Sequence, residues 1–454
     1  MSRESLQQAI NRAGNPVELL RNLDYPAFTF PIRPEFTNWR SEQRAWRETV
    51  ALLDQSHHMT DFFMAPDDRL IALLSRIGVN TFRNFRPGRA KQLVAVNHDG
   101  YVIGDGILFH LGDRLDLVGH HILSDWVRYT IEREGLDVWT HLDPNSAVRE
   151  NGDPVLYRYE LQGPRANHVV EKLTGEPVPA VKFFHIHDFS FAGTTVRGLR
   201  HGMAGEPGFE FLGPYEEGEQ VRAAILEAGA EFGIEPVGAK GYSSTPLESG
   251  WVPTPFPAIF GDDFREYRDW LPLERVGNLA GSLYSNDVED YYLTPYDLGL
   301  GRNVNFDHDF IGKEALQRIV GGPTKQKVTL IWNADDVADA VRSQLTPGTP
   351  AKFIDFPKSR YGFYQFDAVL LGDRRVGVST DPGYVTYEQL YMSLASVDAD
   401  VAAEGTQVEV LWGEDPISAK GVVEPHRQIR LRATVAPAPY HEFARTAYRA
   451  DPQD

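Results

Sequence analysis

The sequence predicts an α+β protein in which a region of helices and antiparallel strands, residues 1–320, precedes a mainly β domain, residues 321–454. Three observations support this. Segments with helical spacing alternate with short apolar strands in the first region. Asp99-Gly100, between two such strands, is a strong hairpin signal. Beyond Gly321-Gly322, short strands alternate with long polar turns, which is typical of a separate β domain.

The elements expected in the first region follow from spacing and turn residues. Apolar residues recur at helical spacing in residues 4–21, although Gly14-Asn15-Pro16 interrupts them. Residues 25–31 contain two prolines and are therefore expected to be extended. A helix is expected over residues 38–53, because two tryptophans share one face. Further helices are expected over residues 67–77 and 122–134, and strands over residues 62–64, 92–97, 101–109 and 115–118.

Length, charge and cysteine content limit the possible functions. At 454 residues the chain should divide into two or three domains. Its net charge of −19 repels nucleic-acid phosphates and anionic lipid, so neither nucleic acid nor a membrane surface is an expected partner. Without cysteine, disulfides, thiolate metal sites and cysteine nucleophiles are excluded. No apolar run is long enough to cross a bilayer and the first residues are polar, which predicts a cytoplasmic protein.

A glycine-rich segment, residues 201–210, holds three glycines and two carboxylates within ten residues. Glycines let the backbone approach a flat ligand closely. A carboxylate such as Glu210 accepts two hydrogen bonds from the amidine-like edge of a pterin or guanine. A site for a heterocycle and a plain glycine-rich hairpin are both compatible with these residues.

Polar side chains also occur where their burial would be costly. Gln55 and His58 lie between a helix and an apolar strand, and His58 is either a site residue or a structural histidine. Asp105 lies between two glycines inside a strand, where a carboxylate needs an open edge or a ligand. His120 precedes a helix and is placed to meet an anion or to serve as a solvated cap. The histidines lack the neighbours of a closed metal site, so we expect no metal.

Residues 238–250 add a phenol, Tyr242, with hydroxyls and a carboxylate, and Trp251 follows them. Together with six other motifs in the same order, this segment resembles the folate-dependent aminomethyltransferases of the glycine-cleavage T-protein type over essentially the whole chain. A set of matches in register is far more specific than any single one. The other motifs are Asp54-Gln55-Ser56-His57-His58-Met59, residues 97–105, Leu161-Gln162-Gly163-Pro164, residues 202–210, Phe310-Ile311-Gly312-Lys313 and residues 376–380.

Two departures separate the chain from the glycine-cleaving members of that family. Gly104 stands in place of the first carboxylate of a paired-aspartate hairpin, although Asp105 remains. Lys240 and Pro246 stand where those members have two arginines. The doubled histidine, the Tyr242 segment and the run from Leu247 to Trp251 instead resemble the aryl-ether branch, the tetrahydrofolate-dependent vanillate and syringate O-demethylases.

The resemblance implies a folate-binding aminomethyltransferase-like fold, with two interleaved subdomains and a barrel-like C-terminal domain. It also implies transfer of an aryl methyl group to N5 of tetrahydrofolate, without a metal or redox cofactor. The implied catalytic residues are Tyr242 and His58. The implied substrate-binding residues are Phe30, Gln55, His58, His120 and Tyr242. The implied folate-binding residues are Glu210, Gln55, Asp105 and Trp251.

Substrate choice also follows from the resemblance. His120, where vanillate-preferring relatives tend to have arginine, is expected to meet the substrate carboxylate. Phe30 occupies a position that can carry a tyrosine hydroxyl in those relatives, and an apolar ring there better accepts a second methoxy group. Syringate is therefore favoured over vanillate. The alternatives are a dimethylsulfoniopropionate- or glycine-type transferase and a non-catalytic folate-binding regulator, and the sequence leaves the oligomeric state open.

Overall fold

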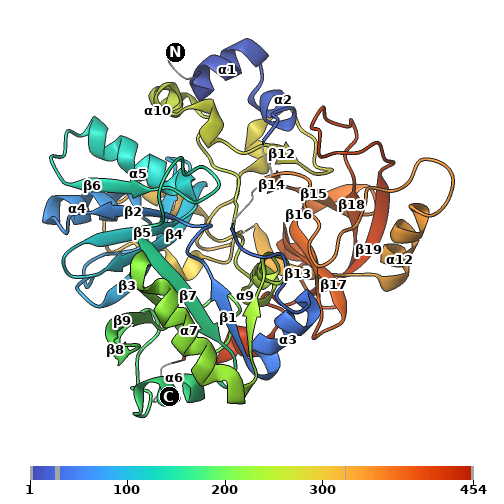
Figure 1. Ribbon diagram of the computed structural model, residues 1–454. Helices are drawn as coiled ribbons and strands as arrows, with labels where there is room; N and C mark the ends of the chain where they lie inside the picture. The colour runs from blue at the N-terminus through green and yellow to red at the C-terminus, as the bar shows by residue number, and fades with distance from the viewer. Residues whose placement is uncertain (1–3, 26–30, 323, 451–454) are drawn as a thin grey trace.

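The structure, a computed structural model, describes residues 4–25, 31–322 and 324–450. Three lobes meet around the centre of the molecule (Figure 1), and they are built on a five-stranded sheet, a six-stranded sheet and a closed barrel. The α+β architecture with a β-rich C-terminal part, predicted from the sequence, is confirmed. No helix within the described ranges combines the length and apolar character needed to cross a membrane.

The five-stranded sheet is antiparallel, with the order β3-β4-β5-β2-β6. The predicted hairpin is present, because Asn97 Oδ1 accepts hydrogen bonds from the backbone N–H groups of Asp99 (3.1 Å) and Tyr101 (2.9 Å). A Cβ atom added at Gly104 would lie 3.3 Å from the Leu123 Cβ atom, so this glycine lets helix α5 approach β4 closely. The elements are β2 (Thr60–Met64), β3 (Arg89–Val96), β4 (Val102–His110), β5 (Leu115–Gly119), β6 (Thr140–Asp143), α4 (Asp68–Ile77) and α5 (His121–Arg133).

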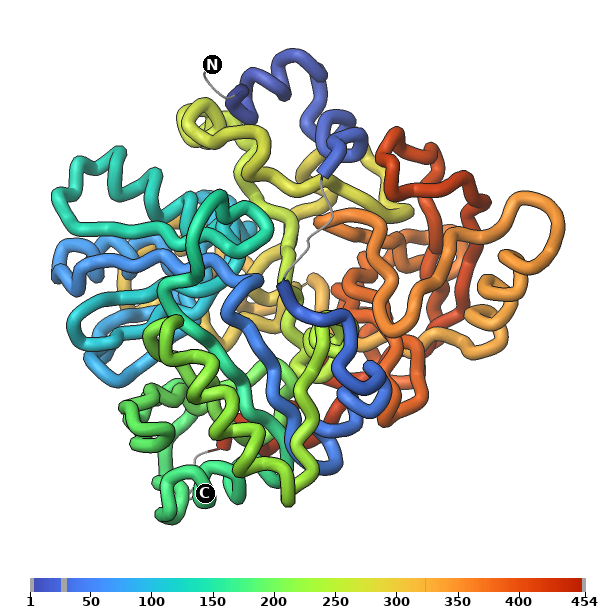
Figure 2. The backbone as a smooth tube through the Cα atoms, viewed as in Figure 1, coloured from blue at the N-terminus to red at the C-terminus, as the bar shows by residue number. Residues whose placement is uncertain are grey.

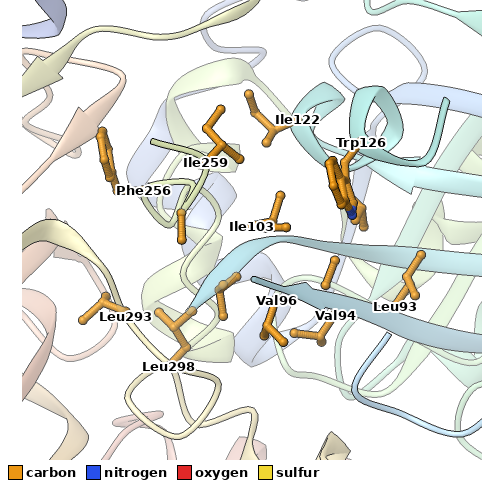
Figure 3. Packing of buried hydrophobic residues seen from close by; sticks show 14 of the residues in the cluster. Leu93, Val94, Val96, Ile103, Ile122, Trp126, Phe256, Ile259, Leu293 and Leu298 are labelled. Atoms are coloured by element: carbon orange, nitrogen blue, oxygen red, sulfur yellow. The ribbon is translucent and has the colours of Figure 1, made fainter. Parts of the chain in front are cut away.

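The largest hydrophobic core begins at this sheet and continues into the other lobes. Figure 3 shows Ile103 of the sheet on the side of Ile122 of α5, and Val96 on the side of Leu298, which comes from a much later segment. The same cluster reaches Leu394 in the barrel. One continuous core therefore fixes the first lobe against the barrel.

The six-stranded sheet has the order β11-β1-β7-β10-β9-β8, and only its β1–β11 pair is parallel. Figure 2 shows that the chain enters this sheet with β1, leaves it to build the five-stranded sheet and returns with β7. The two subdomains are interleaved for this reason. The elements are β1 (Val50–Asp54), β7 (Leu156–Gln162), β8 (Ile186–Phe191), β9 (Thr194–Leu199), β10 (Gly208–Pro214), β11 (Ile234–Val237), α3 (Trp39–Glu48), α6 (Ala166–Thr174) and α7 (Gly218–Gly229).

The helix expected over residues 38–53 is too long. Helix α3 ends at Glu48, and Val50–Asp54 forms strand β1 between β7 and β11. Val50, Ala51, Leu52 and Leu53 are all buried. A strand that is covered on both faces is a continuous apolar run, and over a few residues such a run cannot be told from a buried turn of helix by periodicity.

The barrel closes in the order β13-β17-β16-β15-β18-β19. Its interior contains Trp332 and Trp412, whose ring centroids lie 5.3 Å apart. The elements are β13 (Lys325–Trp332), β15 (Asp367–Leu371), β16 (Arg374–Val385), β17 (Leu390–Asp398), β18 (Gln407–Trp412), β19 (Ile429–Ala436) and α12 (Ala334–Ser343).

Short elements connect the lobes. Residues 4–21 form two helices, with Gly14 in a left-handed conformation between them, at the interruption expected from the sequence. The segment around Tyr242 forms two short helices, α8 and α9. The elements are α1 (Leu6–Ala13), α2 (Pro16–Arg21), α8 (Ala239–Tyr242), α9 (Thr245–Ser249), α10 (Arg265–Trp270), α11 (Lys313–Ile319), α13 (Glu442–Thr446), β12 (Leu279–Ala280) and β14 (Tyr364–Gln365).

Gly163, at the turn between β7 and α6, should be intolerant of a side chain. Its φ is +137°, and an added Cβ would lie 2.6 Å from the Thr49 carbonyl oxygen. We expect Gly163→Ala to lower the free energy of unfolding by about 3 kcal/mol, from backbone strain and overpacking combined. The control is Gly175→Ala, where φ is +73° but nothing lies within 4 Å of the added Cβ. It should lose only about 1 kcal/mol in urea unfolding followed by circular dichroism. Equal losses would contradict the role of the Thr49 contact.

Candidate active site

Two adjoining cavities lie where the lobes meet. The larger has a volume of about 510 Å³ and the smaller about 340 Å³. Four residues, Met59, Gly119, Met203 and Trp251, line both. The cavities are therefore neighbours that share these residues as a common wall.

The smaller cavity contains a hydrogen-bonded histidine–tyrosine pair. His58 lies in the turn after β1, Tyr242 ends α8, and the Tyr242 hydroxyl lies 2.5 Å from His58 Nε2. Burial, with the charges of His57 and Arg158, lowers the pKa of His58 to about 3. Burial, with the charges of Glu160 and Glu210, raises the pKa of Tyr242 well above its usual value. At neutral pH the imidazole is neutral and the phenol keeps its proton.

His120 lines the same cavity as the cap of α5, and it is not a solvated cap. Its Nδ1 accepts a hydrogen bond from the Ile122 N–H group (3.3 Å), so the neutral ring carries its proton on Nε2. That Nε2 atom is buried and has no hydrogen-bond partner. Burial, with the charges of His121 and Arg275, lowers the pKa of His120 well below its usual value. His120 thus offers one unused donor from a neutral ring.

Asp105 and Trp251 lie together at the wall of the larger cavity. Asp105 Oδ2 accepts hydrogen bonds from Gln92 Nε2 (2.6 Å) and from the Trp251 indole N–H (2.9 Å). Burial raises the pKa of Asp105. Lys327 of β13 lines this cavity too, and burial lowers its pKa to about 8. The Asp105 carboxyl group therefore fixes the indole that separates the two cavities.

Glu210 and Gln55 are buried and line neither cavity. Glu210 Oε1 accepts a hydrogen bond from Arg158 Nη1 (2.7 Å), and burial raises the pKa of Glu210 although Arg158 opposes this. Glu160, His201 and Glu210 place one potential ligand atom each within 4.8 Å of one another, and His201 lines the larger cavity. The His201 side chain therefore lies between Glu210 and that cavity. The absence of a metal stays a prediction.

Arg158 is the centre of a buried ionic cluster between the two sheets. From β7 it pairs with Asp61 of β2 (2.5 Å), Asp116 of β5 and Glu210 of β10. Burial, with the charge of Asp61, raises the pKa of Asp116 well above its usual value. The cluster holds the two sheets, and with them the floor of the site, in one arrangement.

Sequence reasoning missed the cavity residues that come from the barrel region and from the segment after it. Lys358 and Arg360 line the smaller cavity, and Tyr448 lines the larger one. The Tyr448 hydroxyl accepts a hydrogen bond from the Gly202 N–H group (2.6 Å) and donates one to the Gly202 carbonyl oxygen (2.8 Å). No local pattern marks these residues, because only the tertiary fold brings them to the site. Phe30, predicted to bind substrate, lies outside the described residues.

Comparisons with known proteins agree with this architecture. The GCVT N-terminal domain family matches residues 11–254. The chain is 42% identical to "Syringate O-demethylase" of Sphingobium sp. (strain NBRC 103272 / SYK-6), over 98% of each chain. It is 31% identical to "Sesamin methylene transferase" of Sinomonas sp. (strain No.22), over 90% of each.

A solved structure shows the same fold at lower identity. The glycine cleavage system aminomethyltransferase T from Bartonella henselae superimposes with a TM-score of 0.60 and 18% identity, covering 95% of this chain and 96% of that one. The aminomethyltransferase-like fold implied by the resemblance is therefore present. With a family match over more than half of the chain and a full-length relative at 42% identity, the chain belongs to the GCVT family.

Proposed function

We propose that this protein demethylates a methoxylated aromatic acid, transferring its aryl methyl group to N5 of tetrahydrofolate and releasing a phenol and 5-methyltetrahydrofolate. The observation that carries the proposal is the His58–Tyr242 pair, in a cavity that adjoins a second one of about 510 Å³. The 42% identity to a protein named "Syringate O-demethylase" supports the same reaction.

The larger cavity fits a reduced folate. Asp105 stands at its wall, and Glu160 and Glu210 each place a carboxylate oxygen within 4.8 Å of a ring nitrogen of His201, which lines the cavity. Glu160 Oε1 is buried without a hydrogen-bond partner, so this oxygen can accept a hydrogen bond from a ligand. A pterin edge presents adjacent N–H donors that match such acceptors. When bound, tetrahydrofolate supplies a nucleophilic amine, N5, as the methyl acceptor. We assign Glu210, Gln55, Asp105 and Trp251 to folate binding.

The chain's own contribution is to help the aryl oxygen leave. A phenolate is a poor leaving group, so its oxygen must be hydrogen-bonded or protonated in the transition state. In the tautomer with the proton on Nε2, neutral His58 donates to the Tyr242 oxygen and leaves the phenol proton for the aryl oxygen. The proton lost by the amine balances the one gained by the product phenol. The shared wall at Trp251 positions the aromatic acid and tetrahydrofolate so that the methyl group faces N5.

Substrate and cellular assignments complete the proposal. We assign His120 to the substrate carboxylate, and Gln55 and Phe30 to the substrate pocket. An apolar Phe30 favours syringate, with 3-O-methylgallate as its product, over vanillate. Residues 1–320 are proposed as the folate- and substrate-binding region and residues 321–454 as a separate domain. The protein is proposed to be cytoplasmic, with neither nucleic acid nor membrane as a partner.

Incubation with syringate or vanillate should give folate-dependent products. We expect the demethylated phenol and 5-methyltetrahydrofolate in equal amounts by mass spectrometry, with a higher kcat/KM for syringate. Neither product should form without tetrahydrofolate. Folate binding without turnover of either acid would refute aryl demethylation and favour another methyl donor or a regulatory role.

Tyr242→Phe should slow turnover without weakening folate binding. Losing a hydrogen-bond donor to the leaving oxygen should reduce kcat about 100-fold, within the range of general acid catalysis. The folate Kd, measured by calorimetry, should change less than about twofold, because no folate contact is assigned to this hydroxyl. Tyr284→Phe, on the exposed surface, is the matched control. A normal kcat in Tyr242→Phe would remove this phenol from the mechanism.

Glu210→Gln should weaken folate binding. Losing a charge-assisted hydrogen bond to the pterin should cost about 1–3 kcal/mol, or about 5- to 150-fold in Kd. Asp61→Asn is the control, because it removes a different carboxylate from Arg158. If both variants weaken folate equally, the effect comes from the ionic cluster and the pterin assignment fails.

A further inference from the structure

The smaller cavity contains a cation that the proposed chemistry has not used. Arg360 lies on the segment that leads from α12 to β14, and its side chain lines the cavity. Its Nη2 atom donates hydrogen bonds to Thr254 Oγ1 (3.2 Å) and to the Phe363 carbonyl oxygen (2.9 Å). Its guanidinium lies 5.4 Å from the centroid of the Phe363 ring. The Arg360 side chain is therefore held in one orientation before any ligand binds.

Arg360 has no carboxylate partner within 4 Å among the described residues. Asp381 is close enough for its charge to affect the pKa of Arg360, but its Oδ2 atom pairs with Lys358 Nζ at 2.6 Å. The positive charge of Lys358 is thereby compensated. Although burial lowers the pKa of Arg360, a guanidinium remains charged at neutral pH. Arg360 is partly exposed to solvent where it borders the cavity, and its guanidinium has no carboxylate of its own in the described part of the chain, so an anionic ligand entering the cavity would supply that partner.

Arg360 shares its part of the cavity with His120. The His120 ring lies 4.7 Å from the Phe363 ring, the same ring that Arg360 covers. The charge of Arg360 contributes to the lowered pKa of His120, which places the two side chains within electrostatic reach. The unpartnered Nε2–H donor of His120 and the Arg360 guanidinium thus form a cationic corner beside an aromatic wall.

We infer that Arg360 binds the carboxylate of the aromatic acid substrate, together with His120, and thereby selects acids over neutral methoxyarenes. The inference rests on the proposed function and deepens it. A guanidinium matches a carboxylate with two parallel hydrogen bonds, which a single imidazole donor cannot supply. Phe363 offers an apolar surface for the substrate ring. A residue from the C-terminal part of the chain then sets the substrate class of a site whose His58–Tyr242 pair comes from the first part.

The test compares syringate with its neutral amide, 4-hydroxy-3,5-dimethoxybenzamide. In Arg360→Met we expect the ratio of the two kcat/KM values, acid over amide, to fall at least tenfold, mainly through a higher KM for the acid. Arg360→Lys keeps the charge but cannot form two parallel hydrogen bonds. Its acid-over-amide ratio of kcat/KM should therefore lie between the ratio of Arg360→Met and that of the wild type. Arg430→Met removes an equal charge from the exposed barrel surface and should keep the wild-type ratio.

Equilibrium binding separates this inference from the proposed function. Calorimetry with syringate and the amide, without folate, gives the same acid-to-amide ratio as dissociation constants and needs no turnover. An unchanged ratio in Arg360→Met, in a variant whose circular dichroism matches wild type, would overturn the role of Arg360. Wild-type protein that demethylates neither syringate nor vanillate would refute the proposed function, and the binding ratio would still decide whether Arg360 recognises the carboxylate.

Discussion

The ion pairs of Arg158 are the constraint on which the site depends. One guanidinium on β7 joins carboxylates on β2, β5 and β10, so it ties the five-stranded sheet to the six-stranded sheet. Removing one partner of such a buried cluster costs more than the cluster contributes to stability, because a charge would be left unpaired. The Arg158 cluster therefore matters for the positions of the residues around it more than for the stability of the fold. It sets where Glu210 stands, and it holds strand β7, which pairs with β1, the strand that precedes the turn carrying His58.

The protein surrounds its ligands with segments that are distant in sequence. β1 contributes the turn that carries His58, α8 contributes Tyr242, and the barrel region contributes Lys327 and Arg360. The wall that the two cavities share is held by the Asp105–Trp251 hydrogen bond. Because burial keeps His58 and His120 neutral, the smaller cavity presents hydrogen-bonding groups that carry no charge, and the Arg360 cation lines it from another lobe.

Much of this could be predicted from the sequence, for reasons that particular residues make clear. Asp99-Gly100 determines its hairpin locally, and motif order placed His58, His120, Asp105, Tyr242 and Trp251 on what proves to be one pair of cavities, although their roles stay predictions. Strand β1 was missed because a doubly covered strand lacks alternation. Arg360 and the ion pairs of Arg158 were missed because long-range pairing leaves no local pattern.

The Tyr448–Gly202 hydrogen bonds have a consequence for biosynthesis. They attach a segment that follows the barrel in the chain to the glycine-rich loop, and Ala444, Tyr448 and Arg449 complete the wall of the larger cavity. A ribosome must translate through the whole barrel before this wall exists. A nascent chain that has folded only its two sheets cannot enclose a ligand in the larger cavity, so synthesis order itself delays binding until the barrel has been made.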